Sequence, residues 1–433
     1  MRKLILSLAA TPLILGSMAV SAQAADDGFN VFSDVKFSAE LRPRYEYTDH
    51  ASSALDAGST FTNRTNLNLT GKLLEVDGLV GTIEVNSVND FNTLDQQNHQ
   101  TAAEKDVAKM TQANIAYTNS GVTGIVGRKT VNLDNQRFIG SVGWKQNFQT
   151  LDLAAVAYGA GDFNILAAYV YGVNAIGDDG FGTRNMTYVG GITSGSTTSA
   201  AINASYKIAD PIKLTGYAYL LGSYSDTYGL AATGKIAAGD SVKLNYRAEF
   251  AMQTDATLEE VSGVSGDTSL RTDSLYYNID VGANISGILL GVNYEVLGGD
   301  DDLTDGRAGQ FDTPLATKHK FNGWADQFLK TPTTGLVDLN VRAGYKFATA
   351  GKVIGVYHMF AADQDGVVNA TNVAAGDAYG SEFDIAYSTK LPGVNNIGLL
   401  VKAAMYMNDT GNAVTADDTT LAWVQLDYKF STK

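Results

Sequence analysis

The sequence predicts an all-β fold, a single transmembrane antiparallel up-and-down β-barrel of about 18 strands with long extracellular loops and short periplasmic turns. Three observations predict it. The chain of 433 residues opens on a secretory leader, it has 45 glycines and 22 tyrosines but no cysteine, and short segments of alternating polarity recur along it. After the leader, no run approaches the roughly 18 apolar residues that a membrane-spanning helix needs. Strands are therefore the elements expected to cross a membrane.

Residues 1–24 have the pattern of a signal peptide. Arg2 and Lys3 form a positive n-region, residues 4–20 are mostly apolar, and the A-x-A cleavage pattern ends at Ala24. A membrane anchor is the alternative, but the apolar run is short and ends in small residues. We therefore expect export through the Sec pathway, cleavage after Ala24 and a mature barrel domain of residues 25–433.

The charge balance and the absence of cysteine exclude several classes of protein. Loss of Arg2 and Lys3 from the 31 basic residues leaves 29 against 46 acidic ones, a net charge of −17. Such an acidic chain would repel nucleic acid. Without cysteine there can be no disulfides, no thiolate chemistry and no covalent c-type haem. No cofactor is predicted.

The first mature segment, residues 36–47, distinguishes a membrane barrel from a secreted sandwich. One of its alternating faces is apolar and ends in Tyr45 and Tyr47, whereas the other carries charges such as Arg42 and Arg44. The same pattern returns many times along the chain. Segments of roughly ten residues with a polar inner face and an aromatic-tipped outer face are typical of transmembrane barrels.

Nineteen segments are candidate strands. In chain order they are 35–47, 62–73, 79–90, 110–118, 123–131, 149–158, 163–173, 183–191, 200–207, 212–221, 226–234, 241–253, 273–284, 288–297, 335–347, 352–361, 378–390, 396–407 and 419–430. Long and short connections should alternate in such a barrel, and bacterial barrels have even strand numbers. The alternation read from the two ends conflicts between 174 and 199. Assigning 183–191 to an outer loop removes the conflict and leaves 18 strands.

The outer face is expected to carry an aromatic girdle. The final segment places Tyr428 and Phe430 outward, as barrel-insertion machinery is expected to require, although three residues follow Phe430. Tyrosines at the ends of apolar faces predict interfacial positions. They are Tyr45, Tyr117, Tyr158, Tyr206, Tyr294, Tyr345, Tyr357 and Tyr428.

The stretch between the fifth and sixth segments, residues 132–148, breaks the alternation. It is dense in groups that want fixed hydrogen-bond partners, such as Gln136, Arg137, Trp144 and Gln146. We expect this loop to fold into the barrel and set its narrow point, with Arg137 as the charge that a solute meets. Replacing Arg137 by Ala should then change the anion/cation permeability without affecting assembly.

Three stretches resemble the alginate-export family of outer-membrane porins. They are GRKTVNLDNQRFIGSVGWKQNFQTLD at 127–152, TPLATKHKFNGWAD at 313–326 with its continuation to Leu336, and YGSEFD at 379–384. The resemblance implies an 18-stranded barrel. In the family's alginate exporter a strongly basic lumen passes an anionic polysaccharide, and by motif position Arg128, Arg137 and Lys145 would contribute to the pore here.

The predicted inner faces carry both signs of charge. The inward basic residues are Lys36, Arg42, Arg44, Arg64, Lys72, Lys207, Lys213, Lys243, Arg247, Arg342, Lys346, Lys390, Lys402 and Lys429. The inward acidic residues are Glu40, Glu46, Glu84, Asp152, Glu249, Asp280, Glu295, Asp338, Glu382, Asp384 and Asp427. This interleaving of 14 basic and 11 acidic groups suits small solutes better than a polyanion.

The sequence therefore favours a passive channel for small polar or charged solutes in the outer membrane of a Gram-negative bacterium. The candidate pore-lining residues are Arg42, Arg44, Arg64, Arg128, Arg137, Lys145, Asp152, Arg247, Glu249 and Arg342. An inward arginine can equally brace the wall by pairing with a cross-strand carboxylate. For Arg42, Arg44 and Arg342 both roles stay open, and for Arg137 solute contact is favoured.

Export of an anionic, alginate-like polysaccharide is the first alternative function, and a barrel that sheathes a redox partner is the second. The chain has no G-x-S-x-G elbow and its four histidines lack ligand spacing, so neither an enzyme nor a metal site is predicted. The expected partners are outer-membrane lipid, lipopolysaccharide, and small solutes or an anionic oligosaccharide. An acidic loop at 300–305 is either a solvated loop or a weak site for divalent cations that bridge to lipopolysaccharide. The barrel could be a monomer or a trimer.

Overall fold

A computed structural model describes most of the mature chain. The described residues are 30–51, 53–91, 99–100, 106–176, 195–222, 224–258, 273–300, 309–368, 371–394, 396–408 and 418–432. Within these ranges no helix is long and apolar enough to cross a membrane. The predicted signal peptide lies outside the described residues.

The regular structure of the described chain is β-strand throughout. The strands are β1 (Phe32–His50), β2 (Gly58–Leu73), β3 (Leu79–Asp90), β4 (Val107–Asn119), β5 (Val122–Lys129), β6 (Thr150–Ala160), β7 (Phe163–Asn174), β8 (Gly195–Ala209), β9 (Ile212–Leu221), β10 (Ser225–Ala238), β11 (Val242–Thr254), β12 (Ser274–Ile285), β13 (Ile288–Leu297), β14 (Leu336–Lys346), β15 (Lys352–Ala361), β16 (Gly366–Val368), β17 (Thr371–Val373), β18 (Ala378–Lys390), β19 (Ile397–Met407) and β20 (Thr419–Ser431). The short strands β16 and β17 pair only with each other.

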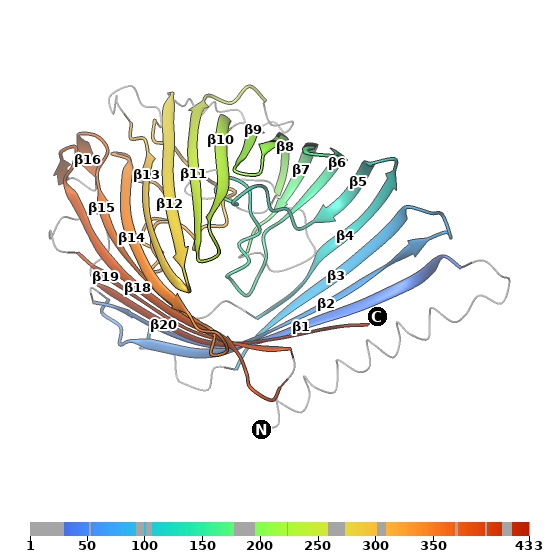
Figure 1. Cartoon of the computed structure of the whole chain (residues 1–433), viewed down its shortest axis with the longest axis horizontal. Coiled ribbons are helices and arrows are strands. Elements are labelled where there is room, and N and C mark those ends of the chain that lie inside the picture. The colour runs from blue at the N-terminus through green and yellow to red at the C-terminus, as the bar shows by residue number, and fades with distance from the viewer. Residues whose placement is uncertain are drawn as a thin grey trace.

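The other 18 strands form one antiparallel sheet that closes on itself (Figure 1). Each pairs with its neighbour in sequence, and β1 closes the ring by pairing with β20, for example Ala39 with Phe430 and Tyr45 with Val424. Closure leaves no unpaired sheet edge, which is the condition for a β-structure to sit in hydrocarbon. The predicted fold class is confirmed.

The predicted strands correspond one to one with the wall. All 18 segments retained by the parity argument coincide with wall strands, and the rejected segment 183–191 lies outside the described residues. Short connections such as 120–121 and 286–287 alternate with long ones such as 130–149 and 298–335. One connection on the long side, residues 222–224 between β9 and β10, is short.

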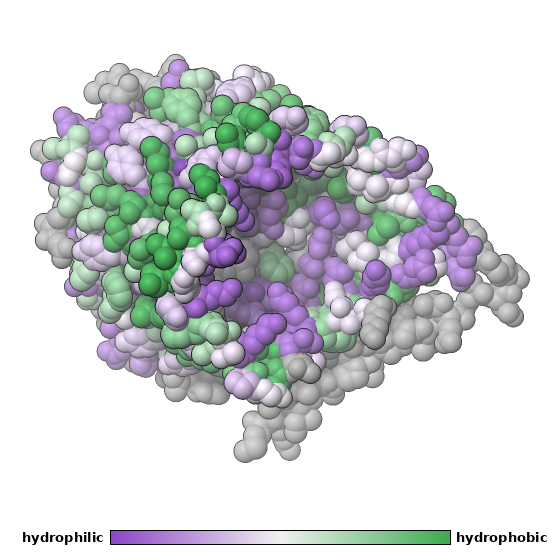
Figure 2. Space-filling model, in the orientation of Figure 1, coloured by the Kyte–Doolittle hydropathy of each residue, from purple (hydrophilic) through white to green (hydrophobic). Residues whose placement is uncertain are grey.

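Alternation along the strands gives the wall two chemically different faces. Val281, Val292 and Val341 are cross-strand neighbours and are 43–52% exposed on the outer face. The residues adjacent to two of these valines, Asp280 and Arg342, face inward and form an ion pair with each other. Figure 2 shows hydrophobic residues over the outer wall and hydrophilic residues around the central hollow. Seven of the eight tyrosines predicted for the girdle are exposed: Tyr45, Tyr117, Tyr158, Tyr206, Tyr294, Tyr345 and Tyr357.

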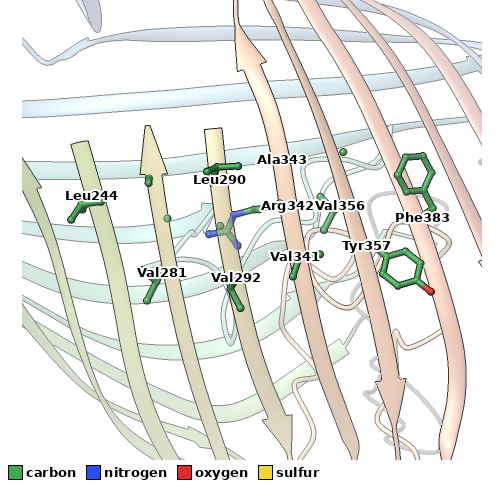
Figure 3. Close-up of a pocket in the computed structure, with 14 residues that line it drawn as sticks. Leu244, Val281, Leu290, Val292, Val341, Arg342, Ala343, Val356, Tyr357 and Phe383 are labelled. Carbon is green, nitrogen blue, oxygen red and sulfur yellow. The ribbon is translucent and has the colours of Figure 1, made fainter. Parts of the chain in front are cut away.

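An apolar groove of about 610 Å³ crosses this outer face (Figure 3). Large exposed side chains such as Val292 and Tyr357 border it, and small residues such as Ala343 and Gly355 form its floor. Most of its lining is the same apolar surface that faces outward elsewhere on the wall, and the charged residue among it, Arg342, pairs with the inward Asp280. The groove therefore suits hydrocarbon, and the polar chemistry of the molecule lies on the other side of the wall.

Two long connections enter the barrel and fill part of its lumen. We call residues 130–149 inward loop 1 and the described residues 309–335 inward loop 2. Both contain many buried residues although neither has regular secondary structure. Figure 1 shows the connection after β5 passing inside the ring of strands. The prediction that 132–148 folds inward is confirmed, and inward loop 2 adds a second segment to the interior.

Candidate functional site: the lumen and its two loops

The two inward loops bind each other inside the barrel. The backbone N–H of Gly140 donates to the carbonyl of Leu315 (2.9 Å), and that of Thr317 donates to the carbonyl of Gln136 (3.1 Å). The side chain of Gln149 donates to both Gly140 O (2.9 Å) and Leu315 O (3.1 Å). A Cβ at Gly140 would lie 2.8 Å from Cβ of Thr317, so glycine permits this close approach. The loops therefore form one unit.

Inward loop 1 lies along the inner face of β1, β2 and β3, where four wall side chains donate to four consecutive loop carbonyls. The pairs are Arg42 Nη1 to Gly143 O (3.0 Å), Arg44 Nη2 to Trp144 O (2.5 Å), Arg64 Nη1 to Lys145 O (3.3 Å) and Asn86 Nδ2 to Gln146 O (3.2 Å). A loop without regular structure satisfies only some of its carbonyls internally, such as that of Val142 by Lys145 N–H, and the other buried carbonyls need partners. This part of the wall supplies them.

The same arginines are also bound to acceptors on the wall. Arg42 donates to Asp427 (Nε–Oδ1, 2.8 Å), and both Arg42 and Arg64 pair with Glu40. Arg44 is 0% exposed and its guanidinium stacks over the ring of Trp144. The structure thus brings together three of the predicted pore residues, and it places them as braces between wall and loop.

Arg137 of inward loop 1 reaches β13 and is enclosed there. Its Nε lies 2.8 Å from Glu295 Oε1, its Nη2 lies 3.0 Å from Asn322 Oδ1, and only 3% of its surface is exposed. Tyr276 also donates to Glu295 (2.8 Å). Burial lowers the pKa of Arg137, but the carboxylate of Glu295 outweighs it and the pKa is raised. The expectation that a solute meets this charge is not supported by its burial, and a role in permeation stays a prediction.

Inward loop 2 is held by carboxylates of β18. The backbone N–H of Ala325 donates to Glu382 Oε1 (2.7 Å), and that of Trp324 donates to Asp384 Oδ2 (3.3 Å). Gly323, with φ of +85°, lies against the same carboxylate, since a Cβ there would be 2.3 Å from Glu382 Oε2. The glycine of the NGW sequence thus serves both a left-handed backbone and a close approach.

The remaining predicted residues occur mainly as ion pairs. Arg128 and Asp152 form a two-pronged pair (2.7 and 3.0 Å), Arg247 binds Glu249 (2.8 Å) and Asp134 of inward loop 1, Arg342 binds Asp280 (2.7 Å), and Lys145 binds Asp326 of inward loop 2 (3.4 Å). All ten predicted residues therefore have partners inside the barrel. Their pore-lining role stays a prediction.

Two aromatic clusters, which the sequence analysis did not identify, anchor the loops. Phe138 of inward loop 1 packs on Tyr217 and Tyr276 with ring centroids 5.1 and 5.3 Å apart. Phe328 of inward loop 2 packs on Phe360 at 4.5 Å. The signal was present, because an aromatic residue in each loop interrupts a polar sequence. It gave no indication of which strands would receive these rings.

Comparisons with known proteins agree with this architecture. The sequence profile of the family described as alginate export matches residues 33–422. No curated protein sequence matches the chain. Among solved structures, Pseudomonas aeruginosa OccK9 (OpdG) is similar with a TM-score of 0.70 at 15% identity, covering 93% of this chain and 100% of that one.

Two further structures are similar at comparable levels. Pseudomonas aeruginosa OpdK with vanillate has a TM-score of 0.69 at 13% identity, covering 94% of this chain and 100% of that one. Acinetobacter baumannii OccAB2 has a TM-score of 0.69 at 13% identity, covering 93% and 99%. At these identities the likeness concerns the fold.

Proposed function

The chain belongs to the alginate export family, and from that premise we propose that it is an outer-membrane porin through which small polar or charged solutes diffuse down their gradients. One observation carries the proposal. A closed wall of 18 strands, apolar outside, surrounds a charged lumen that two inward loops narrow. Such a wall satisfies its backbone groups within hydrocarbon, and a charged, hydrated interior lets polar solutes pass. No catalytic role is proposed.

The selectivity of this channel follows from how its inward charged residues are paired. The ten predicted pore-lining residues are paired, so they offer a field of alternating sign rather than a continuous basic track. We assign to Arg42, Arg44, Arg64 and Arg137 the task of holding inward loop 1, and to the other six the lining of the remaining space. Small solutes of either charge could pass such a lumen.

The direct test is electrical. Purified barrel inserted in a planar lipid bilayer should give steady, ohmic single-channel conductance, and a salt gradient should give a modest reversal potential because both signs line the lumen. A correctly folded barrel without conductance would overturn the proposal. If it then co-purified with a haem protein, the sheath for a redox partner would replace it.

Export of an anionic polysaccharide is the second candidate, and the description of the family favours it. Against it stand the arginines of β1 and β2, whose guanidinium groups already bind Glu40, Asp427 and loop carbonyls. Adding alginate oligomers to the conducting channel separates the two. Weak, voltage-independent effects on current support the porin, whereas saturable block at low oligomer concentration would support export.

Export to and insertion in the outer membrane complete the proposal. The leader of residues 1–24 would direct the chain through the Sec pathway, and the folded barrel would contact lipid and lipopolysaccharide. Intact-mass measurement on protein from isolated outer membranes should give the mass of a chain that begins at Ala25. Native mass spectrometry of the same sample distinguishes monomer from trimer.

A further inference from the structure

The three tryptophans of the chain meet around one lysine of the wall. The ammonium of Lys402 on β19 lies 3.7 Å from the ring centroid of Trp324, 4.2 Å from that of Trp144 and 5.4 Å from that of Trp423. Trp144 belongs to inward loop 1, Trp324 to inward loop 2 and Trp423 to β20. The sequence contains only these three tryptophans. We call them the tryptophan cage.

The same ammonium is hydrogen-bonded within the cage. Lys402 Nζ lies 2.7 Å from Nε2 of His319, a residue of inward loop 2. An ammonium can only donate, so Nε2 accepts, and the ring proton resides on Nδ1, which donates to Asp326 Oδ1 at 2.8 Å. Lys145 of inward loop 1 binds the other oxygen of Asp326 at 3.4 Å. The neutral imidazole thus fits between a cation and an anion.

We propose that Lys402 is a positioning residue of the constriction, which closes both inward loops on one caged cation, and that His319 makes this closure sensitive to acid. The proposal rests on the proposed porin function, because it assigns the residue that fixes the narrow part of the lumen. A desolvated cation over indole faces is attracted by their negative quadrupoles. Without the cation, the cage would hold three large rings and a buried imidazole with no common partner.

We call the tryptophan cage together with Lys402 and His319 the latch. Charged groups from several elements surround it. Asp326 lies on the same loop as His319, and Lys145 lies on inward loop 1. From the wall, Arg44 of β1 stacks over Trp144, and the carboxylates of Asp384 and Glu382 on β18 act on Lys402. Lys402 itself is the cation that faces Nε2 directly. Trp144 also stacks on the imidazole with ring centroids 4.5 Å apart.

Acid should open the latch because a second proton would go on Nε2 of His319, which faces the ammonium of Lys402. The imidazolium and the ammonium would then repel each other. Burial and the charge of Lys402 lower the pKa of His319 from 6.5 to about 3. With the latch open the imidazole regains its ordinary pKa, so the open state binds protons more readily. The contribution of His319 to closure is therefore fully present above about pH 6.5 and is lost as the pH falls. Burial raises the pKa of Asp326, but the hydrogen bond from His319 and the charge of Lys145 outweigh it, and the lowered pKa works in the same direction.

Tryptophan fluorescence reads out this latch alone, since all three fluorophores lie in it. The folded barrel in detergent is titrated from pH 8 to pH 3, and we expect a reversible change in intensity or emission wavelength. His319→Gln offers an amide oxygen to Lys402 and an amide N–H to Asp326 but does not titrate, so this variant should lose the acid transition. A wild-type transition that persists unchanged in His319→Gln, or no transition in the wild type, would overturn the acid switch.

Single-channel recording tests the positioning role at neutral pH. Lys402→Met removes the cation but keeps the length of the side chain, so the loops should separate, conductance should rise and current noise should increase. Lys402→Arg keeps a cation and should conduct closer to the wild type, and Lys243→Met on β11 is the control for loss of an inward lysine outside the cage. Equal conductance and equal emission spectra in Lys402→Met and wild type would overturn the proposal. A non-conducting wild type would instead overturn the porin function, and the fluorescence titration would still decide the latch.

Discussion

The wall holds the two inward loops by opposite chemistry. Where β1 to β3 meet inward loop 1, cationic and amide side chains donate to loop carbonyls, as Arg44 does to Trp144. Where β18 meets inward loop 2, carboxylates accept from loop N–H groups, as Glu382 does from Ala325. We call β1 to β3 the basic sector and β18 the acidic sector. Each sector supplies side chains that complement the backbone groups of the loop that contacts it.

This contrast changes how charges inside a barrel are interpreted. An inward arginine in a sequence suggests contact with an anionic solute, and an inward glutamate suggests contact with a cation. Here three arginines and two acidic side chains satisfy backbone groups of two irregular segments, which have no ladder of their own, and the other predicted pore residues form ion pairs. The charges of the lumen therefore describe its internal scaffold first and its solutes second.

The largest expected effect comes from Arg137, the one arginine of inward loop 1, which binds Glu295 on β13. Arg137→Ala leaves Glu295 buried without its cation, which should weaken the anchoring of the loop by about 3–5 kcal/mol. Hydrogen exchange at Gly140 N–H should accelerate, and single-channel noise should rise. The double variant Arg137→Ala/Glu295→Gln removes the orphaned charge and should recover part of the protection. Unchanged exchange in the single variant would show that the pair contributes little.

The arginines of the basic sector should follow. Arg44→Ala removes the hydrogen bond from a charged donor to Trp144 O, which is worth about 1.5–3 kcal/mol to the anchoring of inward loop 1. Arg44→Lys keeps the charge but offers no planar fork, so it should behave more like Arg44→Ala than like the wild type. Arg342→Ala is the matched control, since Arg342 binds Asp280 on the wall. Hydrogen exchange in inward loop 1 should accelerate in the Arg44 variants and stay near the wild-type rate in the control.

The fold was largely predictable because alternation and closure act on every strand. The segments 79–90 and 288–297, for example, were expected and observed with the same bounds. Every wall strand crosses the membrane once, so long and short connections alternate along the chain. A wrongly assigned strand therefore interrupts this alternation. The exception, the short connection 222–224, did not alter the count because its neighbours still alternate.

The site was predictable only in part, for a physical reason. The unusual stretch 132–148 signalled an inward loop through its density of hydrogen-bonding groups, whereas the stretch 313–326 entered only as a family resemblance and was not expected to fold inward. Which strand receives Arg137, or that His319 lies 2.7 Å from Lys402, depends on how two irregular loops pack in three dimensions. Such segments have no period, and spacing in sequence carries no information about their partners.

A smaller effect is expected from the close approach of inward loop 2 to the acidic sector. Gly323→Ala places a Cβ 2.3 Å from Glu382 Oε2 and imposes a left-handed alanine, which alone costs about 1–2 kcal/mol. Gly376 has nearly the same φ, +84°, but open space around its Cβ. Gly376→Ala therefore reproduces the backbone cost without the clash. Limited proteolysis should release inward loop 2 in Gly323→Ala but not in Gly376→Ala, and equal cleavage in both would remove Glu382 from the explanation.

The smallest effect should come from the neutral member of the basic sector, and it sharpens the contrast between the sectors. Asn86 donates to Gln146 O at 3.2 Å and to Asn147 Oδ1 at 3.3 Å, so Asn86→Ala should loosen inward loop 1 by about 0.5–1.5 kcal/mol. Asn86→Asp has almost the same shape, but it turns the donor into an acceptor that faces a carbonyl oxygen. If donor chemistry is what this sector supplies, exchange at inward loop 1 should be faster in Asn86→Asp than in Asn86→Ala. If the sector acts through shape alone, the order reverses, because the aspartate fills the space that alanine leaves empty.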